Sequence, residues 1–211
     1  MAILLLCLPC SGASKSHIVT PGKPIAVKWL SPTGEKTFDL KVRPLLVDGR
    51  VKEYVTGTAH EITDRLFVVQ RAFRVNDALP GEAAPRWQWQ RGAWLLVDRL
   101  TGRISQLNLP EFDDFFSGSS WYRDYVAYCG TSDDGKKSFA MVVQVGRRKP
   151  ILKNDMGEGG AGTEPDSGCT IPAWQRRPLR VTFQTNDNRK LIFSLRSRVV
   201  DIVDDDESAE P

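Results

Sequence analysis

Three aspartates that could act as paired carboxylates lie close together in the sequence: Asp113, Asp114 and Asp124, around a run of aromatic residues. Glycoside hydrolysis uses two carboxyl groups about 5–9 Å apart, one of them in an apolar pocket that raises its pKa. Aromatic side chains nearby would suit a sugar ring. The same segment also fits a connection whose aromatic residues fill the core while its acids stay in water. The acids therefore support a carbohydrate-active hydrolase as an alternative rather than as the first hypothesis.

A second group with binding chemistry is Trp87, Trp89 and Arg91, which alternate with Gln88 and Gln90. In a strand, residues two apart point the same way, so the indoles and the guanidinium would share one side. Open to water, that side would form a platform for a carbohydrate or a peptide. Covered, it would be core, with the glutamines facing solvent. The sequence leaves both interpretations open.

Trp121 and Tyr122 complete the candidate binding residues. Aromatic and arginine side chains gathered at one end or edge of a sheet would carry recognition.

The sequence gives little support for a metal site, a catalytic nucleophile or a phosphate-binding loop. The chain has two histidines, His17 and His60, too few for a credible zinc site beside the cysteines present. No nucleophile elbow, phosphate-binding glycine loop or calcium-loop spacing occurs. The sequence therefore predicts neither a metal site nor a cofactor, and an enzyme is not the favoured class.

The cysteines and the first residues both bear on localisation. Residues 1–13 read as an apolar stretch followed by small residues, the layout of a signal peptide, although no basic residue precedes it. Without that leader, Cys129 and Cys169 remain, and in an exported chain they predict one disulfide, worth about 3–4 kcal/mol. We expect a periplasmic or secreted protein, with a lipid anchor at Cys10 as a minor alternative.

The elements that would position these residues follow a period of two. Asp48-Gly49 is a strong hairpin signal because Gly accepts a positive φ freely and Asp tolerates it. Thr101-Gly102 predicts another tight turn. The segments 125–129 and 138–145 predict a hairpin, and so do 180–184 and 191–195.

We therefore predict an all-β fold, an antiparallel meander of hairpins arranged as a β-sandwich or as a small propeller-like set of sheets. A single domain would span residues 14–203, with a flexible glycine-rich loop at 153–168. An acidic, disordered tail would follow at 204–211.

Composition limits the partners. The 211 residues carry 29 basic and 26 acidic side chains, a net charge of +3, which does not favour nucleic acid. No apolar run approaches the roughly 20 residues of a membrane-spanning helix. The favoured hypothesis is an exported binding or interaction module for a carbohydrate or protein ligand. The alternatives are the hydrolase and a propeller-like subunit of a larger assembly.

Overall fold

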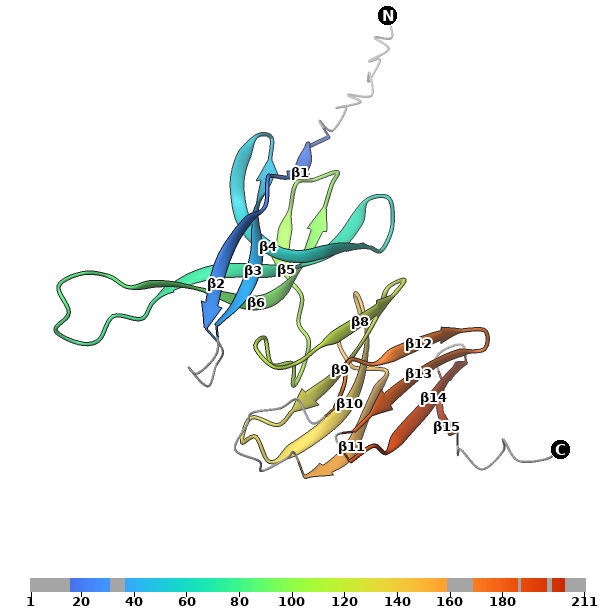
Figure 1. Cartoon of the computed structure of the whole chain (residues 1–211). Coiled ribbons are helices and arrows are strands. Elements are labelled where there is room, and N and C mark those ends of the chain that lie inside the picture. The colour runs from blue at the N-terminus through green and yellow to red at the C-terminus, as the bar shows by residue number, and fades with distance from the viewer. Residues whose placement is uncertain (1–15, 31–36, 159–168, 186, 197–198, 204–211) are drawn as a thin grey trace, which may run out of the picture.

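The structure, a computed structural model, describes residues 16–30, 37–158, 169–185, 187–196 and 199–203. These residues form fifteen β-strands in three sheets, and the described part of the chain holds no helix (Figure 1). Neighbouring strands are joined mainly by hairpins and pair antiparallel, with one exception. The predicted all-β, antiparallel class is confirmed.

The first sheet has seven strands. They are β1 (Val19–Pro21), β2 (Ile25–Leu30), β3 (Thr37–Val47), β4 (Arg50–Glu61), β5 (Leu66–Asn76), β6 (Trp87–Asp98) and β7 (Ile104–Gln106). Strands β2 to β6 pair in succession, and a parallel contact between Trp29 and Trp89 joins β6 back to β2. The five strands form a closed ring, and an odd number of strands in such a meander requires one parallel pair.

The other two sheets have four strands each, paired in chain order. One contains β8 (Ser119–Tyr122), β9 (Tyr125–Thr131), β10 (Lys137–Gln144) and β11 (Leu152–Glu158). The other contains β12 (Ala173–Arg176), β13 (Leu179–Gln184), β14 (Lys190–Arg196) and β15 (Val199–Val203). Because β4 to β7 also pair in chain order, the chain builds three four-stranded meanders one after another.

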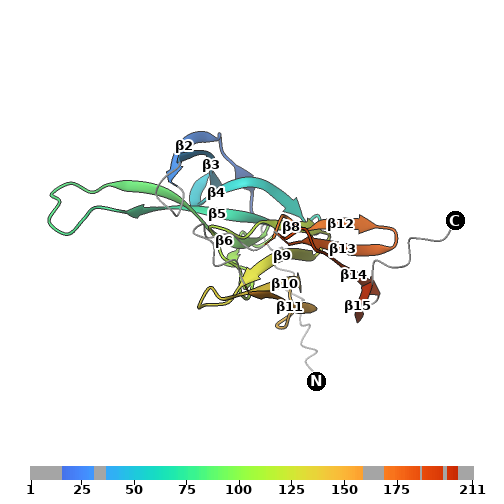
Figure 2. The same ribbon diagram turned by 60° about the horizontal axis from the view of Figure 1, so that its bottom comes forward.

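Tight turns connect the strands where the sequence indicates them. Asp48 and Gly49 have φ values of 52° and 75°, the left-handed conformation that the β3–β4 hairpin requires. Gly102, with φ of 64°, lies in the turn between β6 and β7. Asp98 closes the same turn, since its Oδ1 accepts a hydrogen bond of 2.9 Å from the backbone N–H of Leu100. The hairpin between β5 and β6 projects from the body of the molecule (Figure 1, Figure 2).

The core is continuous from the second sheet to the third. Alternation along β9 and β10 gives the second sheet an apolar surface on both faces. One face packs against the third sheet through Ala127, Cys129, Ala140, Val142 and Met156, which meet Val181, Phe183 and Phe193. The other face carries Val126, Tyr128, Met141 and Val143, against Leu109, Phe112, Trp121 and Phe139.

Cys129 and Cys169 lie at disulfide bonding distance, with their Cα atoms 6.2 Å apart and both side chains buried. Cys129 belongs to β9, and Cys169 precedes β12, where it pairs with Thr185 in an isolated bridge. The predicted pairing is therefore present in the structure, and it ties the segment leading into the third sheet to the second sheet.

The predicted loop at 153–168 begins too early. Residues Leu152–Glu158 form strand β11, which pairs with β10 from Lys137 to Val142. The polar, glycine-containing sequence shows no alternation, but the edge of β10 offers backbone donors and acceptors that this segment satisfies. The rest of that predicted loop, 159–168, lies outside the described residues.

The predicted signal peptide at 1–13, Cys10 within it, and the predicted tail at 204–211 also lie outside the described residues. A search of the described part of the chain for a helix long and apolar enough to cross a membrane finds none.

Candidate recognition face

Trp87 and Trp89 lie near the start of β6 and share one arginine. The guanidinium carbon of Arg74 is 5.7 Å from the ring centroid of Trp87 and 5.5 Å from that of Trp89. Arg74 is on β5, directly opposite Trp89 in the antiparallel register. The two indoles therefore point to the same side of the sheet, as the alternation of the sequence indicates, and they hold a cation between them.

Further aromatic side chains extend this surface over the neighbouring strands. Tyr54 on β4 meets Trp89 edge to face, with the ring centroids 5.3 Å apart. Trp29 on β2 pairs with Trp89 and contacts Phe38 on β3, with centroids 5.8 Å apart. Trp87, Phe38 and Tyr54 expose 57%, 47% and 39% of their surface. We call the set Trp29, Phe38, Tyr54, Arg74, Trp87 and Trp89 the recognition face.

The base of the recognition face is part of the core. Trp29 and Trp89 pack against a buried cluster made by Leu40, Val42 and Ala72. The face is therefore open at Trp87, Phe38 and Tyr54 and covered at its inner end. Of the two interpretations of the Trp87–Arg91 alternation, the one with a side open to water applies at Trp87, and the one with a covered side applies at Trp89.

Arg91 lies at the inner end of the recognition face, over Trp29. Its guanidinium carbon is 4.6 Å from the ring centroid of Trp29, and its Nη2 donates a hydrogen bond to the backbone carbonyl of Phe115. Burial lowers the pKa of the Arg91 guanidinium, against the opposing effect of Asp113 and Asp114. Arg91 thus connects the first sheet to the segment that precedes β8.

Within the strand segments that the structure describes, the charged side chains on this face are positive. In the parts of β2, β3, β5 and β6 that meet here, the register places two charged residues on this side, Arg74 and Arg91. Asp39 lies on the opposite side, where it accepts a hydrogen bond of 2.6 Å from Lys28. Among the described residues, Arg74 makes no ion pair or hydrogen bond.

Trp121 and Tyr122 lie elsewhere, at the junctions between sheets. Trp121 on β8 stacks on His60 of β4, with centroids 5.5 Å apart, and meets Trp94 at 5.0 Å. Trp94 is seven residues along β6 from Trp87, about 24 Å in extended chain. Trp121 therefore holds the first and second sheets together and is separate from the recognition face.

Tyr122 packs the other way, against Trp174 of β12 at 5.7 Å. The indole Nε1 of Trp174 donates a hydrogen bond of 3.1 Å to the carbonyl of Ser120. His60 Nε2 likewise donates to the carbonyl of Arg123 at 2.7 Å. The first strands of the three meanders, β4, β8 and β12, thus contact one another in succession.

The three candidate catalytic aspartates have different surroundings. Asp113 accepts hydrogen bonds of 2.8 and 3.1 Å from the backbone N–H groups of Phe115 and Phe116. It therefore stabilises the backbone conformation of the loop in which it lies. Asp124 accepts one of 2.7 Å from the side chain of Gln144. Burial raises the pKa of Asp114, with a smaller contribution in the same direction from Asp113.

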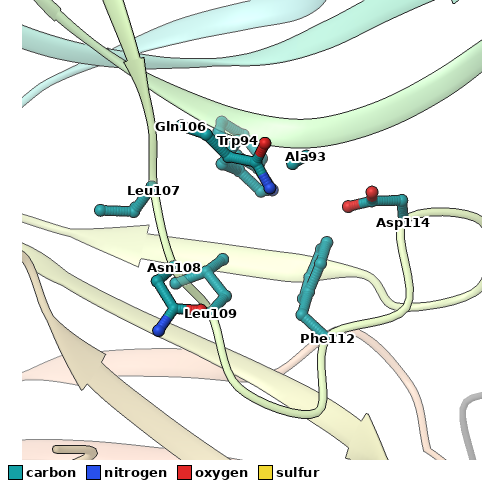
Figure 3. Close-up of a pocket in the computed structure, with 8 residues that line it drawn as sticks. All are labelled: Ala93, Trp94, Gln106, Leu107, Asn108, Leu109, Phe112 and Asp114. Atoms are coloured by element: carbon teal, nitrogen blue, oxygen red, sulfur yellow. The ribbon is translucent and has the colours of Figure 1, made fainter. Parts of the chain in front are cut away.

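Asp114 borders a hollow of about 100 Å³ between the first sheet and the segment leading to β8 (Figure 3). Trp94, Leu109 and Phe112 supply its apolar lining, and Asn108 and Gln106 add amide groups. Sites for small organic molecules usually occupy about 300–1,000 Å³. The hollow fits a few water molecules rather than a sugar ring, so it gives the hydrolase hypothesis no support.

No group of three or more His, Cys, Asp or Glu side chains suited to a metal ion occurs within the ranges that the structure describes. No protein-family model, no curated protein and no solved structure matches the chain.

Proposed function

We propose that the chain is a binding module that recognises its ligand through the recognition face. The observation that carries the proposal is the placement of Arg74 between Trp87 and Trp89, with Phe38 and Tyr54 exposed beside them. Tryptophan, tyrosine and arginine are the residues that contribute most to binding free energy at protein surfaces. Among the described residues Arg74 has no acid partner, and an arginine in that state on an apolar surface favours recognition over a purely structural role.

The test compares Trp87→Ala with Leu100→Ala. Leu100 is 40% exposed and lies in the turn at the opposite end of β6, which is twelve residues long, so it is a matched exposed apolar residue distant from the face. Both variants and the unmodified protein are screened against a glycan panel and a phage-displayed library of random peptides. We expect ligands of one class to bind the unmodified protein and Leu100→Ala and to lose binding to Trp87→Ala. Equal retention by Trp87→Ala, or no binding in either screen, would contradict the proposal.

The second candidate function is a subunit of a larger propeller-like assembly. It is supported by the succession of three four-stranded meanders whose first strands, β4, β8 and β12, contact one another. Propellers are built from four-stranded sheets around a central channel and have about four or more of them. Three meanders would need further sheets, so this candidate predicts self-association on a sizing column with light-scattering detection. A monomer at all concentrations would argue against it.

A further inference from the structure

We propose that the ligand of the recognition face is an acidic segment of polypeptide that places a carboxylate on Arg74 and apolar side chains on the surrounding rings. This inference rests on the proposed function and adds the chemical class of the ligand.

The state of Arg74 indicates the charge of the ligand. Its guanidinium lies over two indole rings, at 5.7 and 5.5 Å from their centroids, and has no ion pair or hydrogen bond within the described residues. Contacts with ring faces leave the N–H groups at the edge of a guanidinium available, and that edge matches a carboxylate in a bidentate arrangement. The recognition face is therefore prepared for an anionic group.

The acids of the neighbouring strands do not compete for this position. Glu53 precedes Tyr54 in β4, so it points away from the face, where it accepts a hydrogen bond of 3.0 Å from Arg71. Asp77 follows β5, close to Trp87 on the paired strand. Its Oδ2 lies 3.5 Å from Nη2 of Arg86 and accepts a hydrogen bond of 2.9 Å from Nε2 of Gln88. Each of these two carboxylates already has a partner, so among the described residues neither is available to Arg74 and a ligand can supply the carboxylate.

The orientation of the rings favours polypeptide over sugar. The planes of Trp29 and Phe38 are inclined by 39°, and those of Tyr54 and Trp89 by 70°. A sugar platform presents ring faces that lie flat against the pyranose, whereas inclined rings form ridges between which side chains fit. Aliphatic or aromatic side chains on either side of the acidic residue would occupy the spaces beside Trp87 and Tyr54.

The β5–β6 hairpin projects from the body of the molecule (Figure 2), and its loop, 77–86, adjoins the face because Trp87 pairs with Asn76 at the end of the ladder. Its tip carries Leu79, which is 62% exposed. A stable protein interface buries about 800 Å² on each partner, more than a few aromatic rings provide. A polypeptide lying on the face could extend along this hairpin and reach such an area.

The test uses peptides enriched from the phage-displayed library by the unmodified protein. Each synthetic peptide is compared with a counterpart in which Asp and Glu are replaced by Asn and Gln. Dissociation constants are measured for the unmodified protein, Arg74→Gln and Arg74→Lys. Arg103→Gln is the matched control, because Arg103 is exposed and lies in the distant turn before β7.

We expect enriched peptides to contain an acidic residue flanked by apolar residues. Arg74→Gln should weaken their binding about tenfold or more, the loss expected for a charge-assisted hydrogen bond, and so should the amide counterpart. Arg74→Lys should fall between, and Arg103→Gln should bind like the unmodified protein. Enriched peptides that lack acids, equal binding by Arg74→Gln, or failure of the library to yield any peptide would overturn the inference.

The two proposals fail in different ways. A glycan or a neutral peptide whose binding depends on Trp87 but not on Arg74 would overturn the ligand class and leave the recognition face as the binding site. A ligand whose binding depends on neither residue would overturn both.

Discussion

Arg74 and Trp89 face each other across the β5–β6 ladder, and the guanidinium carbon of Arg74 lies 5.5 Å from the indole centroid of Trp89. A cross-strand cation and aromatic ring stabilise the sheet modestly, by about 0.5–1 kcal/mol at an exposed site. The same contact fixes the arginine beside Trp87. Trp87 itself stabilises the fold little, because 57% of its surface is exposed. The pair thus gives the outer part of this cluster a fixed shape, which the proposed binding function requires.

Trp87 and Trp89 should differ in their effect on stability. Trp87→Ala removes a side chain that is 57% exposed and should lower the free energy of unfolding by less than about 1 kcal/mol. Trp89→Ala leaves a gap beside Tyr54 and the buried cluster that contains Leu40 and Val42. It should lower the free energy of unfolding by about 3 kcal/mol. Urea denaturation followed by circular dichroism measures both. If Trp87→Ala alone unfolded the protein, Trp87 would be core and the recognition face would lose its exposed member.

Trp121 should stabilise the junction between the first and second sheets rather than ligand binding. Trp121→Ala should lower the free energy of unfolding by about 3 kcal/mol, since its ring contacts both Trp94 and His60. A double-mutant cycle with His60→Ala should give a coupling of about 0.5–1.5 kcal/mol, the value typical of stacked ring pairs. Independent effects of the two substitutions would show that the stacking does not contribute to stability.

The Cys129–Cys169 pair should stabilise the fold when oxidised. The two cysteines are 40 residues apart, and the chain-entropy model assigns such a crosslink about 4 kcal/mol. Replacing both by Ala should lower the free energy of unfolding by about that amount under oxidising conditions and by much less in the presence of reductant. Intact mass before and after reduction should differ by two hydrogens; an unchanged mass would show that the thiols are not joined.

Asp114 should make stability depend on pH. Burial raises the pKa of this carboxyl above its unfolded value, so the ionised form opposes folding at neutral pH. The penalty decreases as the pH falls through the raised folded pKa and is gone below the ordinary aspartate pKa of about 3.9. Asp114→Asn should therefore be more stable than the unmodified protein at pH 7, with a difference that vanishes near pH 3. A variant that is less stable at pH 7 would contradict this assignment.

The sequence is sufficient to predict the strands of the recognition face and the β3–β4 turn. Alternation predicts that Trp87 and Trp89 share a side, and their common contact with Arg74 agrees with it. Asp48-Gly49 predicts a hairpin, and the positive φ values of both residues confirm it. These features are local, because the period of a strand and the conformation of a turn depend on a few consecutive residues.

The composition of the face could not be predicted in the same way. Phe38, Tyr54 and Arg74 come from three other strands, and only the pairing of those strands brings them to Trp89. Trp121 and Tyr122 are consecutive in β8, so they point to opposite sides and contact different sheets. Proximity in the sequence therefore groups Trp121 and Tyr122 with Trp87, although the fold separates them. It leaves out Phe38, Tyr54 and Arg74, which the fold brings to Trp87 and Trp89.

Hydroxyl-radical footprinting with a bound peptide is the most direct test of the recognition face. The probe is the tightest-binding peptide from the library, and mass spectrometry measures the oxidation of each side chain with and without it. We predict that Trp87, Tyr54 and Phe38 are protected, while Leu100 and Ile171, exposed elsewhere, are oxidised at unchanged rates. Unchanged oxidation of Trp87 with the peptide bound would contradict the central claim.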